Sequence, residues 1–387
     1  MITTNTLGDQ PPAGPDNGGI DVAAVGPPSE TPDGSRTLLC FFHGTGGTLF
    51  GIHMVNLCLT LLTLGVYRFW AKTKVREYLW SQTELWTETE FADDRFAYHG
   101  TGKELLVGFL RAVVIFGIPY ALLANGPSVA GAAPWIQTAA SLLAGVLVML
   151  FIPVAIVAAR RYRLSRTSWR GIRFSFRGPI LKFVTLWIKG AILTGLTLGI
   201  YYPFFASERQ AFLVSHSQFG SRGFRFDGNG WDLLKAFFIP YTMTSLAAAA
   251  LIMLSFYQGL LESIHGMSVA IVSLVVLYAL LYPILWGWYL VKQQRYFWNQ
   301  TSLGGSRFQS SMTPWTYFKL KAGNFFLLVV TLGFAWPWTT VRNIRYVLSH
   351  LTLQAPTDLE AILQDKQTAT PTGEGLDSFL DTGFDFG

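Results

Sequence analysis

The sequence predicts a polytopic α-helical membrane protein built on an internal repeat. Of the 387 residues, 51% are hydrophobic and only 13% are charged, and the apolar residues gather in long runs. Soluble domains carry about a quarter charged residues, so this shortfall favours a bilayer over a large water-soluble core. Trp and Tyr lie beside the apolar runs, as is typical of residues at membrane interfaces.

Four apolar runs are long enough to cross a bilayer. They cover residues 105–124, 135–159, 233–256 and 267–291. A crossing helix needs about 20 apolar residues. Backbone polar groups in hydrocarbon must bond within their own segment, so we expect these four runs to be helices.

Three further apolar runs are shorter, and each contains the tripeptide Thr-Leu-Gly (TLG). Polar residues such as Lys189 and Asn324 interrupt them and leave about 12 to 16 apolar positions, short of a comfortable span. Two interpretations stay open. Either all runs cross, giving seven spans, or the TLG segments are re-entrant or interfacial. In the second case the bend residues are Thr63, Gly65, Thr197, Gly199, Thr331 and Gly333.

The TLG tripeptides recur at a spacing of 134 residues, which indicates an internal repeat. The same spacing relates Arg161-Tyr162 to Arg295-Tyr296. The repeat divides the chain into two full units and a third that stops early. The predicted divisions are a disordered tail over 1–37, membrane units over 38–175, 176–309 and 310–355, and a disordered acidic tail over 356–387.

Charge predicts which loops face the cytoplasm, because short cytoplasmic loops are rich in Lys and Arg. Seven arginines follow residue 159, whereas the connectors 125–134 and 257–266 contain no Lys or Arg. Seven crossings would put the basic loops 206–232 and 292–314 on the opposite side from the earlier basic loops. Re-entrant TLG segments keep every basic loop and both tails in the cytoplasm, and fit the charge better.

Polar segments follow the helices and alternate aromatic and polar residues, as in Arg173-Phe174-Ser175-Phe176-Arg177. Alternation with a period of two is typical of a strand with two different faces. Gly-Ser and Arg-Gly pairs between such stretches suit turns. We expect small cytoplasmic β-hairpins with aromatic residues turned inward, and plain juxtamembrane loops are the alternative.

Several of these motifs together resemble the YjgN family of bacterial inner-membrane proteins. The resemblance rests on "TLGVYRFWAKTKVREY", starting at Thr63, and on "RFAYHG", ending at Gly100, and it extends over about residues 38–355. Ala335 stands where the motif has an aromatic residue, and Tyr202-Pro203 replaces Arg68-Phe69. The resemblance implies a multi-pass protein of the inner membrane. The family's function is unknown, so no catalytic residue is implied.

The sequence contains no enzyme signature that survives inspection, and we expect no catalytic residues, cofactor or metal. The six histidines lack metal-ligand spacing. The expected partners are anionic lipid headgroups, not nucleic acid, because the cations lie at the ends of apolar runs. Two functions remain: a transporter or channel for a small, anionic solute or a lipid, and a non-transporting scaffold that binds anionic lipid or partner proteins. Candidate pathway or lipid-contact residues are Arg111, Lys189, Lys235, Arg160, Arg161 and Arg295.

Overall fold

The computed structural model describes residues 36–86, 95–260 and 265–355, and all structural statements concern these residues. In this part of the chain, one order of elements occurs five times: a strand, a helical hairpin and a second strand. We call these repeats units 1 to 5; they are smaller than the membrane units predicted from the sequence. Units 1, 3 and 5 contain the TLG tripeptides and have short hairpins, whereas units 2 and 4 have long hairpins.

The elements of the three short units recur with equal helix lengths, 17 residues for the first helix and 14 for the second. Unit 1 contains β1 (Arg36–Phe42), α1 (Gly46–Leu62), α2 (Arg68–Ser81) and β2 (Thr83–Trp86). Unit 3 contains β5 (Ile172–Phe176), α6 (Ile180–Leu196), α7 (Tyr202–Ser215) and β6 (Ser217–Phe219). Unit 5 contains β9 (Ser306–Ser310), α10 (Pro314–Val330), α11 (Trp336–Ser349) and β10 (Leu351–Ala355).

The two long units have the same plan with longer helices. Unit 2 contains β3 (Phe96–Tyr98), α3 (Gly102–Ala112), a π-helical stretch (Val113–Gly117), α4 (Ile118–Val129), α5 (Pro134–Ser165) and β4 (Thr167–Trp169). Unit 4 contains β7 (Arg222–Phe226), α8 (Gly230–Leu260), α9 (His265–Asn299) and β8 (Thr301–Leu303).

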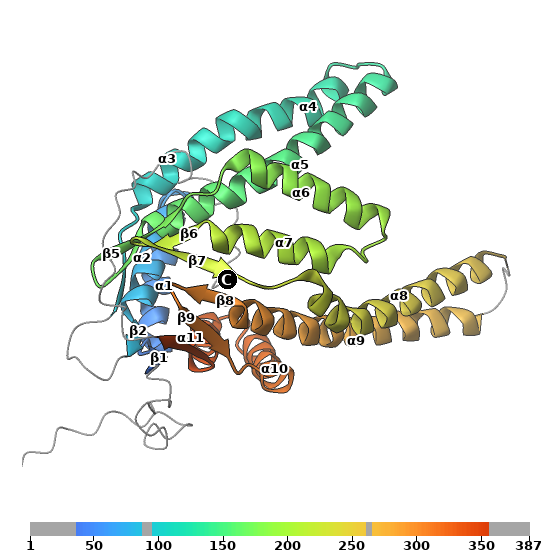
Figure 1. Ribbon diagram of the computed structural model, residues 1–387. Coiled ribbons are helices and arrows are strands. Elements are labelled where there is room, and N and C mark those ends of the chain that lie inside the picture. The colour runs from blue at the N-terminus through green and yellow to red at the C-terminus, as the bar shows by residue number, and fades with distance from the viewer. Residues whose placement is uncertain (1–35, 87–94, 261–264, 356–387) are drawn as a thin grey trace, which may run out of the picture.

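Four helical stretches in the described residues are long and apolar enough to cross a membrane, and they contain the four predicted runs or most of each. They are Gly102–Val129, Pro134–Ser165, Gly230–Leu254 and Leu274–Asn299. Figure 1 shows these long hairpins extending well beyond the short hairpin formed by α6 and α7. These stretches are consistent with the helical membrane architecture expected from composition.

The ten strands form one antiparallel sheet in the order β2-β1-β10-β9-β8-β7-β6-β5-β4-β3. A further bridge joins Glu84 to Arg95 and brings the two edges of the sheet together in a nearly closed barrel. The sequence predicts separate β-hairpins, whereas the strands join into one ten-stranded sheet. Strands that follow one another across a tight turn do pair, but each also pairs with a strand across a helical hairpin, as β1 does with β2.

Tight turns join unit 2 to unit 3, unit 3 to unit 4 and unit 4 to unit 5 at the end of the barrel away from the helices. Arg170 and Gly171 have φ angles of 49° and 74°, and Gly304 and Gly305 have φ angles of 56° and 103°. Positive φ at both central residues is the conformation of the two-residue turn that matches the twist of paired strands. The Arg-Gly and Gly-Gly pairs therefore fix the register of the barrel.

The helices form a ring above the barrel. The second helix of each unit contacts the first helix of the next, in the pairs α2–α3, α5–α6, α7–α8 and α9–α10, and α11 contacts α1. The last pair brings residues at opposite ends of the chain together, as β1 and β10 do in the sheet. All five hairpins therefore leave the same face of one barrel and return to it.

In units 1 and 4 a tyrosine and a glycine hold the hairpin against its strand. The hydroxyl of Tyr78 accepts a bond from the backbone N–H of Thr45 at 2.8 Å, and that of Tyr296 accepts from Asn229 at 2.7 Å. A Cβ atom at Gly44 or Gly228 would overlap the ring of the aromatic residue two positions earlier. The spacing aromatic-x-Gly, present in "RFAYHG", therefore lets an aromatic ring fold over the chain where a strand leads into a helix.

Candidate functional site

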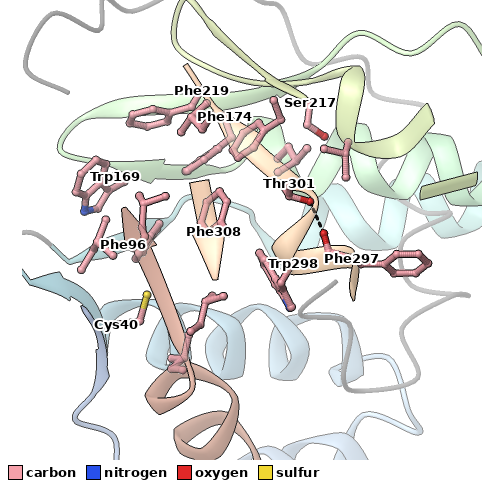
Figure 2. A pocket seen from close by; sticks show the side chains of 18 of the residues that line it. Cys40, Phe96, Trp169, Phe174, Ser217, Phe219, Phe297, Trp298, Thr301 and Phe308 are labelled. Carbon is pink, nitrogen blue, oxygen red and sulfur yellow. Dashed lines mark hydrogen bonds between the residues drawn. The ribbon is translucent and has the colours of Figure 1, made fainter. Parts of the chain in front are cut away.

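The candidate site is a cavity of about 290 Å³ inside the barrel, where the strands meet the helix ring. Figure 2 shows aromatic side chains from several strands, including Phe96, Trp169, Phe174, Phe219 and Phe308, gathered around it. Ligand pockets in proteins typically measure about 300–1,000 Å³, so the cavity lies at the small end of that range.

Equivalent positions of all five units build the wall of the cavity in layers. One layer is the fourth residue after each second helix: Leu85, Trp169, Phe219, Leu303 and Leu353. A second layer is the sixth residue before each first helix: Cys40, Phe96, Phe174, Phe224 and Phe308. The first layer is buried and packs with the second in one hydrophobic cluster. The repeated strands therefore place one apolar ring above another along the barrel.

The helices close the cavity with a third apolar layer and a set of polar groups. The apolar layer is the penultimate residue of each second helix: Trp80, Leu164, Val214, Trp298 and Leu348. One turn further from the barrel, Arg160, Gln210 and Gln294 occupy equivalent positions of α5, α7 and α9 and line the same cavity. Gln294 is exposed, whereas Arg160 and Gln210 are half-buried. The polar end of the cavity therefore faces the helix ring.

The charge of the cavity wall is small and positive. Arg160 is its one lining cation, and its described lining residues include no Asp or Glu. Burial raises the pKa of the Cys40 thiol on the wall to about 12, so this group is neutral at physiological pH. An apolar body with a single acidic or strongly polar end matches such a wall, because a charge-assisted bond to Arg160 offsets the loss of hydration at that end.

The six candidate pathway or lipid-contact residues do not come together in space around one site. Arg160 lines the cavity, and Arg161 donates a hydrogen bond to the backbone oxygen of Gly178 at 2.9 Å. Lys189 lies 3.7 Å from Glu208, and Lys235 lies 3.2 Å from Asp232. Arg111 and Arg295 are exposed on α3 and α9.

The TLG residues lie in tight turns between two antiparallel helices in all three short units. Leu64, Leu198 and Leu332 have φ angles of 51°, 52° and 48° and are 95%, 83% and 89% exposed. The glycine that follows each leucine has a φ of 90–102°. Leucine rarely adopts this left-handed conformation, which costs roughly 1–2 kcal/mol for a residue other than glycine.

In each TLG turn, backbone groups form hydrogen bonds within the turn and with the threonine side chain. Thr63 Oγ1 donates to the oxygen of Leu59 at 2.8 Å and accepts from the N–H of Tyr67 at 2.9 Å. The N–H of Gly65 donates to the oxygen of Thr60 at 2.7 Å. The same three bonds recur around Thr197 and Gly199 and around Thr331 and Gly333. The threonine hydroxyl therefore replaces the water that would normally bond such a turn.

Sequence reasoning missed the aromatic cavity. The alternation in Arg173-Phe174-Ser175-Phe176 indicated a strand with an aromatic face, but the pairing of that strand with others far along the chain was not visible. Counting residues from the helix ends would have grouped the five equivalent wall positions. Among the described residues, no group of three or more His, Cys, Asp or Glu side chains could hold a metal ion.

Comparisons with known proteins give a family and a location. A family model described as "Bacterial protein of unknown function (DUF898)" matches residues 38–379. The inner membrane protein YjgN of Salmonella typhimurium (strain LT2) is 25% identical over 374 residues, covering 84% of this chain and 91% of the relative. The inner membrane protein YjgN of Escherichia coli (strain K12) is 32% identical over 168 residues, covering 43% of this chain and 38% of the relative. No solved structure matches the chain.

Proposed function

The chain belongs to the DUF898 family of bacterial proteins of unknown function, and from that premise we propose that its barrel cavity binds an amphipathic molecule with an acidic end. The predicted resemblance to the YjgN family is confirmed, and the protein is a bacterial inner-membrane protein. Within that setting the proposed role is a transporter for a small anionic solute or a lipid.

One observation carries the proposal: the apolar cavity lies on the axis of the ring, with Arg160, Gln210 and Gln294 at its helix end. A path for hydrated ions would have polar groups along its length. Along its length this wall is instead mostly aromatic and aliphatic. The hydroxyls of its Thr83, Ser217 and Thr301 donate to backbone oxygens of the helices. Such a wall favours the apolar part of an amphipathic molecule. It also lacks the paired acid and base that hydrolytic chemistry uses, so we propose binding or transport in place of catalysis.

The proposal includes a topology in which the four long helical stretches cross the membrane and the three short hairpins enter it and return. The barrel and both tails are then cytoplasmic. The positive-inside rule supports this, because Arg160, Arg161 and Arg163 lie at the barrel end of α5 and the connector 125–134 lacks cations. The TLG turns support it too, since backbone in hydrocarbon must be bonded internally.

A scaffold that binds anionic lipid is the second candidate, and the outer face of the barrel favours it. Arg173, Arg225 and Arg307 are exposed on strands β5, β7 and β9. In the proposed topology this face is cytoplasmic, and Arg225, which lies closest of the three to the helices, is the best placed to meet the anionic leaflet, where a cation contributes about 1 kcal/mol to binding. Lipid headgroups are the proposed partner, and nucleic acid is not.

The test of the cavity uses the full chain in lipid nanodiscs and a fluorescent polyene fatty acid as the probe. Arg160→Gln removes the cation and installs the residue found at the equivalent positions 210 and 294, so the fold is retained. We expect saturable probe binding that weakens at least tenfold in Arg160→Gln. Arg163→Gln, also on α5 but outside the cavity, serves as the matched control and should bind as the unaltered protein does. Absence of saturable binding, or equal binding by both variants, would overturn the proposal.

A measurement of substrate flux distinguishes the transporter from the scaffold. Vesicles containing the protein are loaded with the labelled fatty acid, and its movement is followed in the unaltered protein and in Arg160→Gln. Flux that depends on Arg160 supports transport. Unchanged flux together with changed recovery of anionic lipid in Arg225→Gln supports the scaffold.

A further inference from the structure

The ring of hairpins contains one place where two short hairpins are neighbours. Units alternate short and long along the chain, but there are five of them, so unit 5 meets unit 1 where the ring closes. Strand β1 pairs with β10 there, and α1 contacts α11. We call this contact the seam. Every other hairpin contact in the ring joins a short hairpin to a long one.

An open groove of about 340 Å³ lies at the seam. One wall is a single stripe of α1 formed by Phe50, His53, Met54 and Leu57. The other wall is the TLG turn of unit 5, from Leu332 to Phe334, with the start of α11. We call this space the seam groove. Its walls are apolar except for His53 and the indole N–H of Trp336.

Comparison with unit 3 shows one side chain that the seam lacks. There the neighbouring long helix α8 supplies Tyr241, whose hydroxyl donates to the oxygen of Leu198 at 2.9 Å and covers the turn. Tyr241 is the eleventh residue after the first residue of α8, and the equivalent residue of α1 is Leu57. Leucine is smaller and has no donor. Tyr241 lies at 3.4 Å from a Cβ built on Gly199, whereas no atom lies within 4 Å of one built on Gly333, nor of one built on Gly65 in unit 1.

The dimensions of the seam groove suit one acyl chain. His53 lies seven residues into α1, about 10 Å along the helix at 1.5 Å per residue. From there to the turn that follows α1 is about 15 Å along the helix, half of the roughly 30 Å thickness of a bilayer's hydrocarbon core. In the proposed topology the equivalent turn of unit 5 lies at the same depth. His53 therefore lies at the depth of the glycerol esters of the cytoplasmic leaflet, and Leu332 lies near the bilayer centre. These depths depend on the proposed topology, in which the short hairpins enter and return.

We propose that the seam groove binds one acyl chain of a glycerophospholipid from the cytoplasmic leaflet, with the His53 imidazole donating a hydrogen bond to the ester region. The lipid fills the space that Tyr241 and the long helix α8 fill beside unit 3. It stabilises the contact between the first and last units, which close the ring. This site is separate from the barrel cavity and shares no lining residue with it.

The experiment uses the full chain in vesicles of phosphatidylethanolamine and phosphatidylglycerol containing a phospholipid with a diazirine midway along one acyl chain. After photolysis, labelled peptides are identified by mass spectrometry. We expect labelling of the groove peptides, around residues 50–57 and 332–337, at least fivefold above that of the lipid-facing surface of α6. Equal labelling of the two surfaces, which indicates bulk lipid only, would overturn the proposal.

Two variants and a matched control sharpen the result. Leu57→Trp fills the groove and should reduce its labelling at least fivefold, whereas Leu61→Trp, on the same helix at an exposed position outside the groove, should leave it unchanged. His53→Leu keeps the groove apolar and should lower the number of phospholipids retained in native mass spectrometry by one. Unchanged labelling in Leu57→Trp, or unchanged lipid retention in His53→Leu, would contradict the site. Probe binding by the barrel cavity reports on the proposed function separately.

Discussion

The long and short hairpins rise from the same barrel but end in different chemistry. The tip of the first long hairpin is rich in small and polar residues, includes Gly131 with a φ of 65°, and is followed by Trp135, which is 72% exposed. Each short hairpin instead ends in an exposed leucine held at positive φ, with a threonine that bonds its backbone. Exposed turns in water usually use Gly, Asn or Asp at positive φ.

The comparison indicates that the residue types at a hairpin tip depend on how far the hairpin extends from the barrel. A 17-residue helix is about 25 Å long, and its companion of 14 residues is about 21 Å long. Part of that length lies beside the polar ends near the barrel, so in the proposed topology a short hairpin reaches about the middle of a bilayer. A turn there meets no water, and apolar side chains with internally bonded backbone are the stable solution. In the same topology the long hairpins reach the far interface, where small polar turns and tryptophan suit the headgroups.

The largest expected effect comes from placing a charge at a short tip. Leu198→Asp relieves strain, because Asp adopts positive φ readily, and in water it would be neutral or stabilising. In hydrocarbon it should cost about 2.5–3.5 kcal/mol of unfolding free energy, measured in lipid bicelles. Ala130→Asp at the long tip is the control and should change stability by less than about 0.5 kcal/mol. A Leu198→Asp protein as stable as the unaltered protein would contradict the claim that the short tips lie in hydrocarbon.

A smaller effect is expected when a TLG turn loses its internal bond. Thr197→Val keeps the shape of the side chain but removes the acceptor of the Tyr201 N–H and the donor to Leu193. Leaving a buried donor unbonded costs about 1–3 kcal/mol. Thr185→Val in α6 removes only a side-chain donor to Leu181 and should cost well under 1 kcal/mol. Equal losses for the two variants would show that the turn is bonded by solvent instead.

The smallest effect concerns the hydrogen bond from the long helix α8 to the tip of unit 3. Tyr241→Phe removes the hydroxyl that donates to Leu198 and keeps the ring. Interhelical hydrogen bonds in membrane proteins contribute about 0.6 kcal/mol on average. We expect a loss of that size in the same unfolding assay, and Tyr282→Phe on α9 should give none. A loss above about 2 kcal/mol would mean that α8 supports the turn more strongly than packing at a tip allows.

Much of the helical part of the fold could be predicted from the sequence. The four long runs give the spanning helices because length and apolar composition are local properties. Thr63 and Gly65 could be assigned to a bend because a polar residue and a glycine interrupt an apolar run at the same spacing three times. The charge distribution then favoured a return to the same side.

The barrel and its cavity could not be predicted in the same way. Strand β1 pairs with β10, more than 300 residues later, and such a pairing leaves no mark in the local pattern of either strand. Arg160 was a candidate residue, but its equivalence to Gln210 and Gln294 depends on counting from helix ends. Arg111, Lys189 and Lys235 were candidates because they are charged residues in apolar runs, and the structure places them outside the cavity.

The central claim is that all five hairpins return to one cytoplasmic barrel, and cysteine accessibility tests it most directly. In the full chain carrying Cys40→Ala and Cys58→Ala, single cysteines replace Ser215, Ser349 and Ala133, all of which are exposed. The account predicts that a membrane-impermeant maleimide labels positions 215 and 349 only in inverted vesicles, and position 133 only in right-side-out spheroplasts. Labelling of positions 215 and 349 from opposite sides would show that the TLG segments cross the membrane and would contradict the account.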